Sequence, residues 1–248
     1  KFAPDKLILI GDPKQLPATI KSKACEAHDY QRSMMARLME DCGQPYEMLD
    51  IQYRMHPAIC HWTSTTYYSG KLKTAPGLLA RSSPIQTLLI PQHFKQACVF
   101  FNVKSAENRR AGSKGQSIDN DLEAEAIIDI LCQCLLHMDS HQIGVIAFYA
   151  AQVELLKQKA AKKRGDLAKK IAETHIGTVD AFQGEEKDFI ILATTRTSES
   201  TGFLRDQRRI NVASSRARHG FFVVADAAIL DSNNDLARWC MQCQHAAS

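Results

Sequence analysis

The chain has no apolar run long enough to cross a membrane. A membrane-spanning helix needs about 20 mostly apolar residues, and the longest stretches here, such as Phe-Phe-Val-Val-Ala at residues 221–225, are far shorter. The amino-terminal residues show neither the apolar core of a signal peptide nor its small-residue cleavage pattern. We therefore expect a protein that spans no membrane, is not secreted and acts inside the cell, in the cytoplasm or the nucleus.

Cysteine is too sparse for a disulfide framework. The chain has 8 cysteines in 248 residues, a density that favours a reducing compartment. The one Cys-x-x-Cys pair, Cys240 and Cys243, lacks the second pair of ligands that a structural zinc site needs. We expect free thiols, no zinc and no other metal ligands in this chain.

Neither sign of charge dominates. The 31 Lys and Arg residues against 27 Asp and Glu residues give a formal net charge of +4. This balance permits a nucleic-acid partner, but it is also common among proteins that bind none. The length allows one large domain or two modest ones, each with a real apolar core.

Short β-rich runs alternate with longer segments of helical period, which is the pattern of a parallel sheet flanked by helices. The expected strands are residues 7–10, 98–103, 143–148, 176–179, 189–194 and 221–225. Most of them are too continuously apolar for the edge of a sheet.

Two helices are expected between the strands. The first, residues 122–138, carries its apolar side chains on one stripe and has Asp119 or Asn120 as its N-cap. The second, residues 150–164, ends in three cations and is stopped by Gly165. The basic cluster from Lys157 to Lys170 fits a solvated face or a binding site.

The segment at residues 104–117 is polar and contains two glycines. This composition is typical of connecting segments that bury little apolar surface. We expect a mobile polar loop there.

Polar residues follow the first expected strand, at residues 11–17 (Gly-Asp-Pro-Lys-Gln-Leu-Pro). Open α/β folds bind ligands at the carboxyl ends of their strands, where Gln15 can read a phosphate or a water. A proline-fixed turn with no ligand fits the same residues.

An aromatic residue stands beside an arginine at residues 52–57 (Gln-Tyr-Arg-Met-His-Pro). Tyr53 offers a stacking face for a base, and Arg54 offers a planar fork for phosphate oxygens. A buried tyrosine next to a surface arginine is the alternative. Pro57 can begin a helix, and we expect His56 to be structural.

Residues 177–188 (Gly-Thr-Val-Asp-Ala-Phe-Gln-Gly-Glu-Glu-Lys-Asp) lie between two expected strands. A turn with a hydroxyl, an amide, a glycine and carboxylates suits contacts to sugar and phosphate. A charged hairpin or a plain βα loop is the alternative.

Arginines gather at residues 208–218 (Arg-Arg-Ile-Asn-Val-Ala-Ser-Ser-Arg-Ala-Arg). We expect Arg209, Arg216 and Arg218 to lie partly on one helical face. An arginine that meets the charge developing on a transferring phosphoryl group can accelerate the reaction by orders of magnitude. Contact with nucleic acid or a solvated surface is the alternative.

Taken in order, these four segments resemble the later motifs of superfamily 1B helicases, the branch that includes the nonsense-mediated-decay helicase and senataxin. Residues 202–206 (Gly-Phe-Leu-Arg-Asp) add a further match, and the resemblance runs from residue 7 to residue 225. It implies an α/β fold, a RecA-like parallel sheet with flanking helices, as the second motor domain of a P-loop NTPase. In this family two RecA-like domains clamp ATP between them and move 5′ to 3′ along single-stranded RNA or DNA.

The resemblance also implies roles at a nucleotide site. Gln15 would sense the γ-phosphate from the first domain, and Arg54 and Arg216 would be the arginine fingers of the second. Tyr53 would stack on the adenine. On the turn that begins at Gly184, Glu186 would bind the ribose hydroxyls.

Contacts to nucleic acid follow from the same resemblance. Thr178 and Val179 would touch the backbone without regard to sequence, and Tyr149 and Arg196 are further candidates. Two positions depart from the family pattern: Ala147 stands where a threonine is usual, and Ser214-Ser215 replaces Leu-Thr.

The chain contains no Gly-x-x-x-x-Gly-Lys-Ser/Thr loop, and no Asp-Glu magnesium motif precedes Leu7. In the family both belong to the first RecA-like domain. We therefore expect residues 1–42 to be the tail of that domain and residues 43–248 to be the second domain.

ATP and Mg²⁺ are expected as cofactors of the full-length parent, whose first domain would be a partner of this one. The chain alone is expected not to hydrolyse ATP, because it lacks the phosphate cradle and the metal ligands. An inactive relative that serves as a nucleic-acid or protein-binding scaffold is the alternative.

Overall fold

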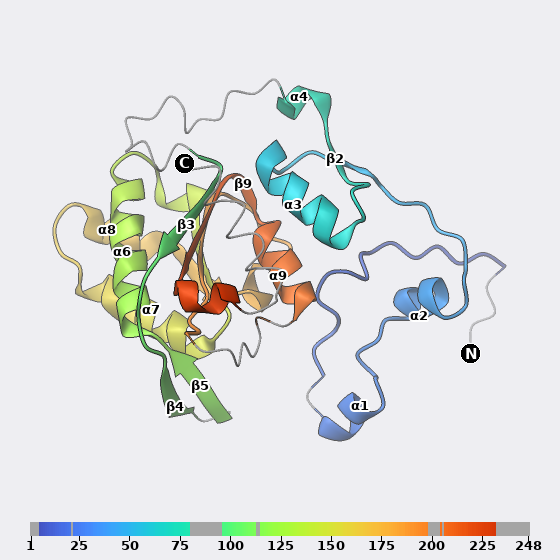
Figure 1. The fold of residues 1–248 in the computed structure, drawn as a ribbon, viewed down its shortest axis with the longest axis horizontal. Coiled ribbons are helices and arrows are strands. Elements are labelled where there is room, and N and C mark those ends of the chain that lie inside the picture. Colours follow the sequence, from blue (N-terminus) through green and yellow to red (C-terminus); the bar gives the residue numbers. More distant parts are fainter. Residues whose placement is uncertain are drawn as a thin grey trace. The chain divides into compact units, whose positions relative to one another are not determined.

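A computed structural model describes residues 5–20, 22–79, 96–112, 115–197, 204 and 206–231. The chain forms two compact units, Lys1–Leu49 and Asp50–Ser248, which are described separately (Figure 1). Cys240, Cys243 and most of residues 202–206 lie outside the described residues. In the described part, no helix is long and apolar enough to cross a membrane, and the described cysteines are free thiols.

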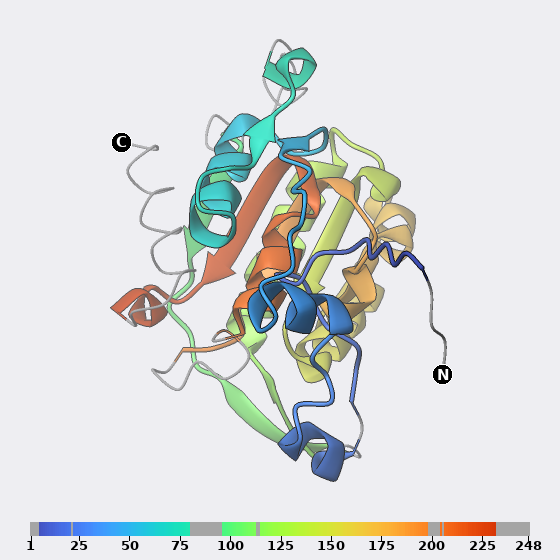
Figure 2. The ribbon, with the colours of Figure 1, turned by 90° about the vertical axis from the view of Figure 1, so that its right-hand side faces the viewer.

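The second unit is built around a five-stranded parallel sheet with the order β3-β9-β8-β6-β7 (Figure 2). Its strands are β3 (Cys98–Asn102), β6 (Ile143–Ala147), β7 (His175–Thr178), β8 (Lys187–Ala193) and β9 (Ala217–Ala225). All expected strands except residues 7–10 are therefore confirmed. The expected α/β class with a RecA-like parallel sheet is confirmed as well.

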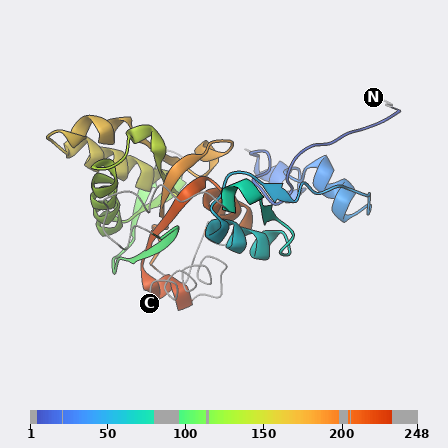
Figure 3. The same cartoon turned by 90° about the horizontal axis from the view of Figure 1, so that it is seen from above.

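Helices cover both faces of this sheet (Figures 1 and 3). One face carries α6 (Asp121–Leu135), α7 (Ala150–Lys162) and α8 (Leu167–Glu173), and the other carries α3 (Pro57–Tyr67) and α9 (Gln207–Ser214). Because both faces are covered, the central strands can be apolar at nearly every position. All five residues of β6 are buried.

The remaining elements are short. The first unit holds α1 (Lys23–Ala27) and α2 (Met34–Glu40). The second unit adds β1 (Ile51–Gln52), β2 (Lys73–Thr74), α4 (Pro76–Leu79), β4 (Asn108–Gly112), β5 (Gly115–Asp119) and the 3₁₀ turns Ser140–Gln142, Asp180–Phe182 and Ala227–Asp231.

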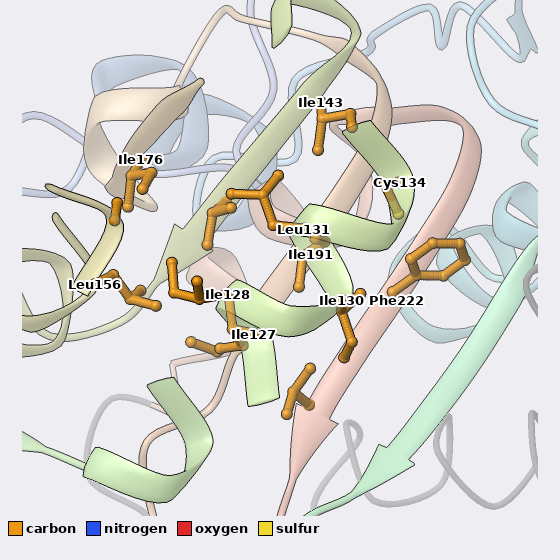
Figure 4. Packing of buried hydrophobic residues seen from close by; sticks show 14 of the residues in the cluster. Ile127, Ile128, Ile130, Leu131, Cys134, Ile143, Leu156, Ile176, Ile191 and Phe222 are labelled. Atoms are coloured by element: carbon orange, nitrogen blue, oxygen red, sulfur yellow. The ribbon is translucent and has the colours of Figure 1, made fainter. Parts of the chain in front are cut away.

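The apolar stripe of α6 packs on the sheet, as the helical period predicts (Figure 4). Ile127 and Leu131 are fully buried, together with Ile191 of β8 and Phe222 of β9. Each such side chain contributes about 1.5–3 kcal/mol by leaving water. The helix starts at Asn120, whose side chain accepts a hydrogen bond from the Glu123 amide at 3.1 Å, so one of the two expected N-caps is confirmed.

The second expected helix is confirmed as α7. Its C-cap, Lys163, has left the helical conformation, and Gly165 follows with φ +86°. Lysines of the basic cluster pair with acidic residues of α6: Lys159 lies 3.0 Å from Asp121 and Lys163 lies 3.0 Å from Asp129. These contacts favour the solvated-face interpretation of the cluster.

The prediction of a loop at residues 104–117 is wrong for β4 and β5, which form an antiparallel hairpin. Gly112 of β4 pairs with Gly115 of β5. Ile118 is buried, and the Ser117 hydroxyl accepts a hydrogen bond from the Ala151 amide at 3.2 Å. Cross-strand pairing and the burial of Ile118 thus order a segment whose composition is polar.

The prediction of a buried strand at residues 7–10 is also wrong. These residues form no strand pair, and Ile8 and Ile10 are 81% and 92% exposed. A parallel strand needs neighbours on its hydrogen-bonding edges, and the described residues of this unit contain no other strand. The apolar composition of residues 7–10 favours a strand, but no described segment of the first unit pairs with these residues.

Glu123 is fully buried beneath the carboxyl end of β8. The Thr195 amide donates to its two oxygens at 2.8 and 3.0 Å, and the Thr194 hydroxyl donates at 3.2 Å. Burial outweighs these hydrogen bonds and raises the pKa of Glu123 from 4.5 to about 8. The carboxyl is therefore protonated in the folded chain at neutral pH.

Glu123→Gln should change how stability depends on pH. In the wild type the protonated Glu123 contributes its full share of the free energy of unfolding below pH 4.5, where the carboxyl is protonated in the folded and the unfolded chain. This contribution is lost as the pH rises to about 8. The amide cannot ionise, so the free energy of unfolding of the variant should exceed that of the wild type by an amount that grows between about pH 5 and 8, on the order of 3 to 5 kcal/mol in all. Urea unfolding at several pH values measures this difference.

The matched control is Glu125→Gln, which replaces an exposed carboxyl on the same helix. It should follow the wild-type pH dependence. If Glu123→Gln and the wild type gave parallel curves, the raised pKa would be wrong.

Candidate nucleotide site

Three segments that lie far apart in the sequence meet at the amino ends of β8 and β9. The loop after β1 carries Arg54, the turn before β8 carries Glu186, and the turn before β9 carries Arg216. The Arg54 guanidinium donates to the Ser215 carbonyl at 3.0 Å, and the Lys187 amide donates to the Arg216 carbonyl at 3.0 Å. The sheet thus brings three of the predicted site residues together.

The loop that carries Tyr53 and Arg54 is shaped by the side chain of Gln52. Its amide oxygen accepts hydrogen bonds from the backbone of Arg54 at 2.8 Å and of Met55 at 2.7 Å. Its amide nitrogen donates to the Met55 carbonyl and to the Thr74 hydroxyl, at 2.8 and 2.9 Å. The Tyr53 ring is left 75% exposed, where it offers a face to a planar ligand.

His56 closes this loop, and its predicted structural role is confirmed. Its Nδ1 accepts a hydrogen bond from the Ala58 amide at 3.2 Å, which caps α3 with Pro57 in the first turn. Its own amide donates to the Arg218 carbonyl at 2.7 Å. Burial lowers the pKa of His56, with His219 adding to the effect, so the ring stays neutral and able to accept.

The turn that carries Glu186 belongs to a short crossover between two parallel strands, not to a hairpin. Phe182 packs under the sheet against Gly144, where an added Cβ would lie 2.7 Å from the ring. Gly184 has φ +87°, a backbone conformation that favours glycine. This tight path delivers Glu185 and Glu186 to the amino end of β8.

The Glu186 carboxylate lies between two arginines. Arg54 donates to its Oε2, and Arg218 donates to its Oε1 through Nη2 and, at 3.0 Å, through Nε. Arg218 also pairs with Asp188 at 3.5 Å. The hydrogen bonds from Arg218 and then from Arg54 hold the pKa of Glu186 below its usual range, so Glu186 keeps its negative charge between the two arginines.

Arg216 is 3% exposed, and its guanidinium is held by the protein. It donates to the Val212 carbonyl at 2.9 Å, to the Glu185 carbonyl at 3.3 Å and to the Ser215 hydroxyl at 2.8 Å. Ser215, which replaces the family's threonine, therefore keeps a hydroxyl where Arg216 uses one.

The expectation of a shared helical face for Arg209, Arg216 and Arg218 is wrong. Only Arg209 lies in α9, whereas Arg216 follows the helix and Arg218 lies in β9. The helix ends because the chain turns into the strand, and the Ser215 hydroxyl bonds back to the Val212 carbonyl at 3.2 Å.

The candidates for nucleic-acid contact lie at the carboxyl ends of the strands, away from the amino ends that carry Arg54, Glu186 and Arg216. Thr178 ends β7, and Val179, Tyr149 and Arg196 follow strands β7, β6 and β8. Val179 and Tyr149 are buried, and the Arg196 guanidinium is buried in an ion pair with Glu107 at 2.9 Å. Contact between Arg196 and nucleic acid thus requires this ion pair to open.

Two further features of this end of the sheet involve Thr178 and Ala147. The Thr178 hydroxyl is half-buried and accepts a hydrogen bond from the Ala181 amide at 3.3 Å. Ala147, which lacks the family's hydroxyl, accepts a hydrogen bond from the Val179 amide at 3.2 Å through its backbone carbonyl.

Gln15 belongs to the first unit. Its side-chain amide donates to Asp12 Oδ2 at 2.9 Å. The backbone amide of Lys14 donates to Asp12 Oδ1, also at 2.9 Å. The Asp12 side chain therefore organises the turn that presents Gln15.

The sequence assigned no role at the nucleotide site to Gln52 or Arg218. Gln52 looked like the start of a motif, and nothing in its spacing indicated that it orders the loop. Arg218 was visible as a basic neighbour of Arg216, but its partner Glu186 is 32 residues away. Only the pairing of β8 with β9 brings these two side chains together.

The described residues contain no cluster of three or more His, Cys, Asp or Glu side chains that could hold a metal ion. Arginines and a carboxylate at the amino ends of the strands can supply cations for phosphate and an acceptor for hydroxyls. Together with the parallel sheet, these features fit the RecA-like α/β class of domain.

Comparison with known proteins agrees with this class. A family model described as an AAA domain matches residues 30–228, and the chain belongs to that family, as a carboxyl-terminal domain of the superfamily 1B helicase type. It is 33% identical over 233 residues to "Helicase SEN1" of Saccharomyces cerevisiae, covering 90% of this chain and 10% of that protein.

Two further relatives extend the comparison. The chain is 35% identical to "DNA-binding protein SMUBP-2" of Rattus norvegicus, over 92% of this chain and 23% of that protein. It is 35% identical to "Regulator of nonsense transcripts 1" of Dictyostelium discoideum, over 92% of this chain and 17% of that protein. The chain thus spans only a minor part of the length of these relatives.

Proposed function

We propose that this chain is the second motor domain of an ATP-dependent helicase or translocase that moves 5′ to 3′ along single-stranded RNA or DNA. The observation that carries the proposal is the meeting of Arg54, Glu186 and Arg216 at one edge of the sheet. Side chains suited to phosphate and to ribose from three separate segments converge there, as a shared nucleotide site requires.

Each residue has a chemical task in this proposal. Arg54 and Arg216 stabilise the charge that develops as the γ-phosphate is transferred. Glu186 accepts hydrogen bonds from the ribose hydroxyls, and the exposed Tyr53 ring stacks on the adenine. Gly184 supports the turn that orients Glu186.

The rest of the ATP site would come from the preceding RecA-like domain, to which the first unit belongs in this proposal. Residues 7–10 would join the sheet of that domain, which would cover the exposed Ile8 and Ile10 side chains. Gln15 would then sense the γ-phosphate. The phosphate cradle and the Mg²⁺ ligands would lie in that domain, so this chain alone would not hydrolyse ATP.

The nucleic acid would run along the carboxyl ends of the strands. The half-buried Thr178 would contact its backbone, and Val179, Tyr149 and Arg196, which are buried here, would contact it only after this end of the sheet opens. A nucleic acid held mainly through its backbone is bound with little regard to sequence. Such a protein acts in the nucleus or the cytoplasm.

A scaffold without ATPase activity is the alternative. It would use the same sheet to bind nucleic acid or protein, but it has no need of two arginines beside a ribose-binding carboxylate. The retention of Arg54, Glu186 and Arg216 together with Gln15 favours the motor.

Arg216→Ala in the full-length protein should reduce nucleic-acid-stimulated ATP hydrolysis several hundred-fold or more, the range expected for an arginine finger. Binding to single-stranded RNA and DNA should stay unchanged, because Arg216 lies at the other edge of the sheet. Steady-state ATPase rates and fluorescence anisotropy measure the two effects.

Arg164→Ala is the matched control, since Arg164 is exposed just after α7 and donates to the nearby Ala161 and Lys163 carbonyls. An unchanged rate in a folded Arg216→Ala variant would remove the role assigned to Arg216. A wild type with no ATPase activity on either polymer would favour the scaffold.

Tyr53→Ala should raise the KM for ATP more than it lowers kcat. Stacking on the adenine stabilises the ground state and the transition state alike, so its loss weakens binding without slowing chemistry. Tyr53→Phe keeps the ring and should behave like the wild type. A fall in kcat with unchanged KM would contradict the stacking role.

A further inference from the structure

The two arginines that hold Glu186 differ in how they are fixed. Arg218 lies in β9, and its strand pairs with β8 through Lys187 and Ala217, the neighbours of Glu186 and Arg218. Arg54 comes from a loop between β1 and α3, outside the five-stranded sheet. The contact between Arg218 and Glu186 is therefore built into the sheet, whereas the contact between Arg54 and Glu186 joins the sheet to a separate loop.

The proposed function places conflicting demands on the second contact. Arg54 must turn to the γ-phosphate, and it then gives up the oxygen of Glu186 that it holds here. Glu186 must stay in place, ionised, to accept hydrogen bonds from the ribose. If no other cation held it, the Glu186 carboxylate would be free to change rotamer or to follow the departing Arg54.

We propose that Arg218 is a positioning residue that keeps Glu186 oriented toward the ribose when Arg54 leaves it for the nucleotide. This inference rests on the proposed function and assigns Arg218 a part in recognition of the sugar. Arg218 uses Nε and Nη2 on Oε1 of Glu186, so Oε2 is the oxygen that Arg54 vacates and that a ribose hydroxyl can reach.

The local charges are consistent with this exchange. With Arg54 in place, two arginines face Glu186 and Asp188. After Arg54 leaves, Arg218 still faces both carboxylates, and the nucleotide phosphates supply the negative charge that Arg54 needs. No charge at the cluster is left without an opposite partner at either stage.

The simpler interpretation is that Arg218, Glu186 and Asp188 only tie β8 to β9. All three side chains are partly exposed, at 47%, 32% and 22%, and such surface pairs contribute little to stability. A purely structural pair would affect the melting temperature and would not affect which sugar is accepted. Selectivity for the sugar is therefore the measurement that separates the two interpretations.

The test compares ATP with 2′-deoxyATP in the full-length protein, using kcat/KM for each nucleotide. Arg218→Ala should raise the KM for ATP about tenfold with kcat within about twofold, because a ground-state contact is lost. Its preference for ATP over 2′-deoxyATP should fall to the level of Glu186→Gln. The double variant should show no further loss, since the two residues act as one unit.

Arg218→Lys keeps the charge without the two parallel hydrogen bonds and should restore part of the preference. Arg164→Ala is the matched arginine control and should keep the wild-type preference. Melting temperatures without nucleotide report any structural effect separately.

Different failures identify different errors. No ATP hydrolysis by the wild type would overturn the proposed function and this inference with it. Hydrolysis with an unchanged nucleotide preference in Arg218→Ala would overturn this inference alone, as would equal use of the two nucleotides by the wild type. A collapse of kcat with the preference intact would place Arg218 on the phosphates, which also contradicts a positioning role.

Discussion

A parallel sheet can be stable only when both of its faces are covered, and this constraint shapes the second unit. Two neighbouring parallel strands need a crossover connection, because the chain must return to the end where the first strand began before the second can start. The crossovers place α6, α7 and α8 on one face and α9 on the other. Because the strands are parallel, the turns that enter β8 and β9 meet at the amino ends of the strands. The residues that leave β6, β7 and β8 meet at the carboxyl ends.

The proposed chemistry follows this division. Arg54, Glu186 and Arg216 lie at the amino ends of the strands, where the Arg54 and Arg216 guanidinium groups donate to the Ser215 and Glu185 carbonyls of neighbouring turns. Arg216 is buried on the carbonyls of Val212 and Glu185. In its proposed role Arg216 would leave these carbonyls before it met a phosphate, and its hydrogen bond to the Glu185 carbonyl joins it to the turn that carries Glu186. Nucleotide binding and finger movement would therefore be coupled through one short crossover.

Much of the fold could be predicted from local pattern. Continuous apolar runs identified the central strands because a doubly covered sheet removes the polar face. The stripe and the N-cap of α6 were predictable because they depend only on helical period and on Asn120. The hairpin at residues 108–119 was missed, because its order comes from cross-strand pairing and from burial at the end of β5, where Ile118 and Asp119 leave water.

The site was predictable in its residues and less so in its geometry. Motif resemblance picked out Arg54, Glu186 and Arg216, but the pairing of Glu186 with Arg218 depends on the register of β8 with β9. The burial of Arg216 depends on where α9 ends. Neither can be read from spacing along the chain. Residues 7–10 were expected to form a strand and do not, for a similar reason. Pairing partners, and not composition alone, decide whether an apolar segment becomes a strand.

The most direct measurement is a structure of the full-length protein with ADP, aluminium fluoride and single-stranded nucleic acid. We expect both guanidinium groups, of Arg54 and of Arg216, within hydrogen-bond distance of the fluoride, with Glu186 on the ribose and still on Arg218. Arg216 should have left the Val212 carbonyl. A bound nucleotide that neither arginine touches would contradict the assignment of this edge as half of an ATP site.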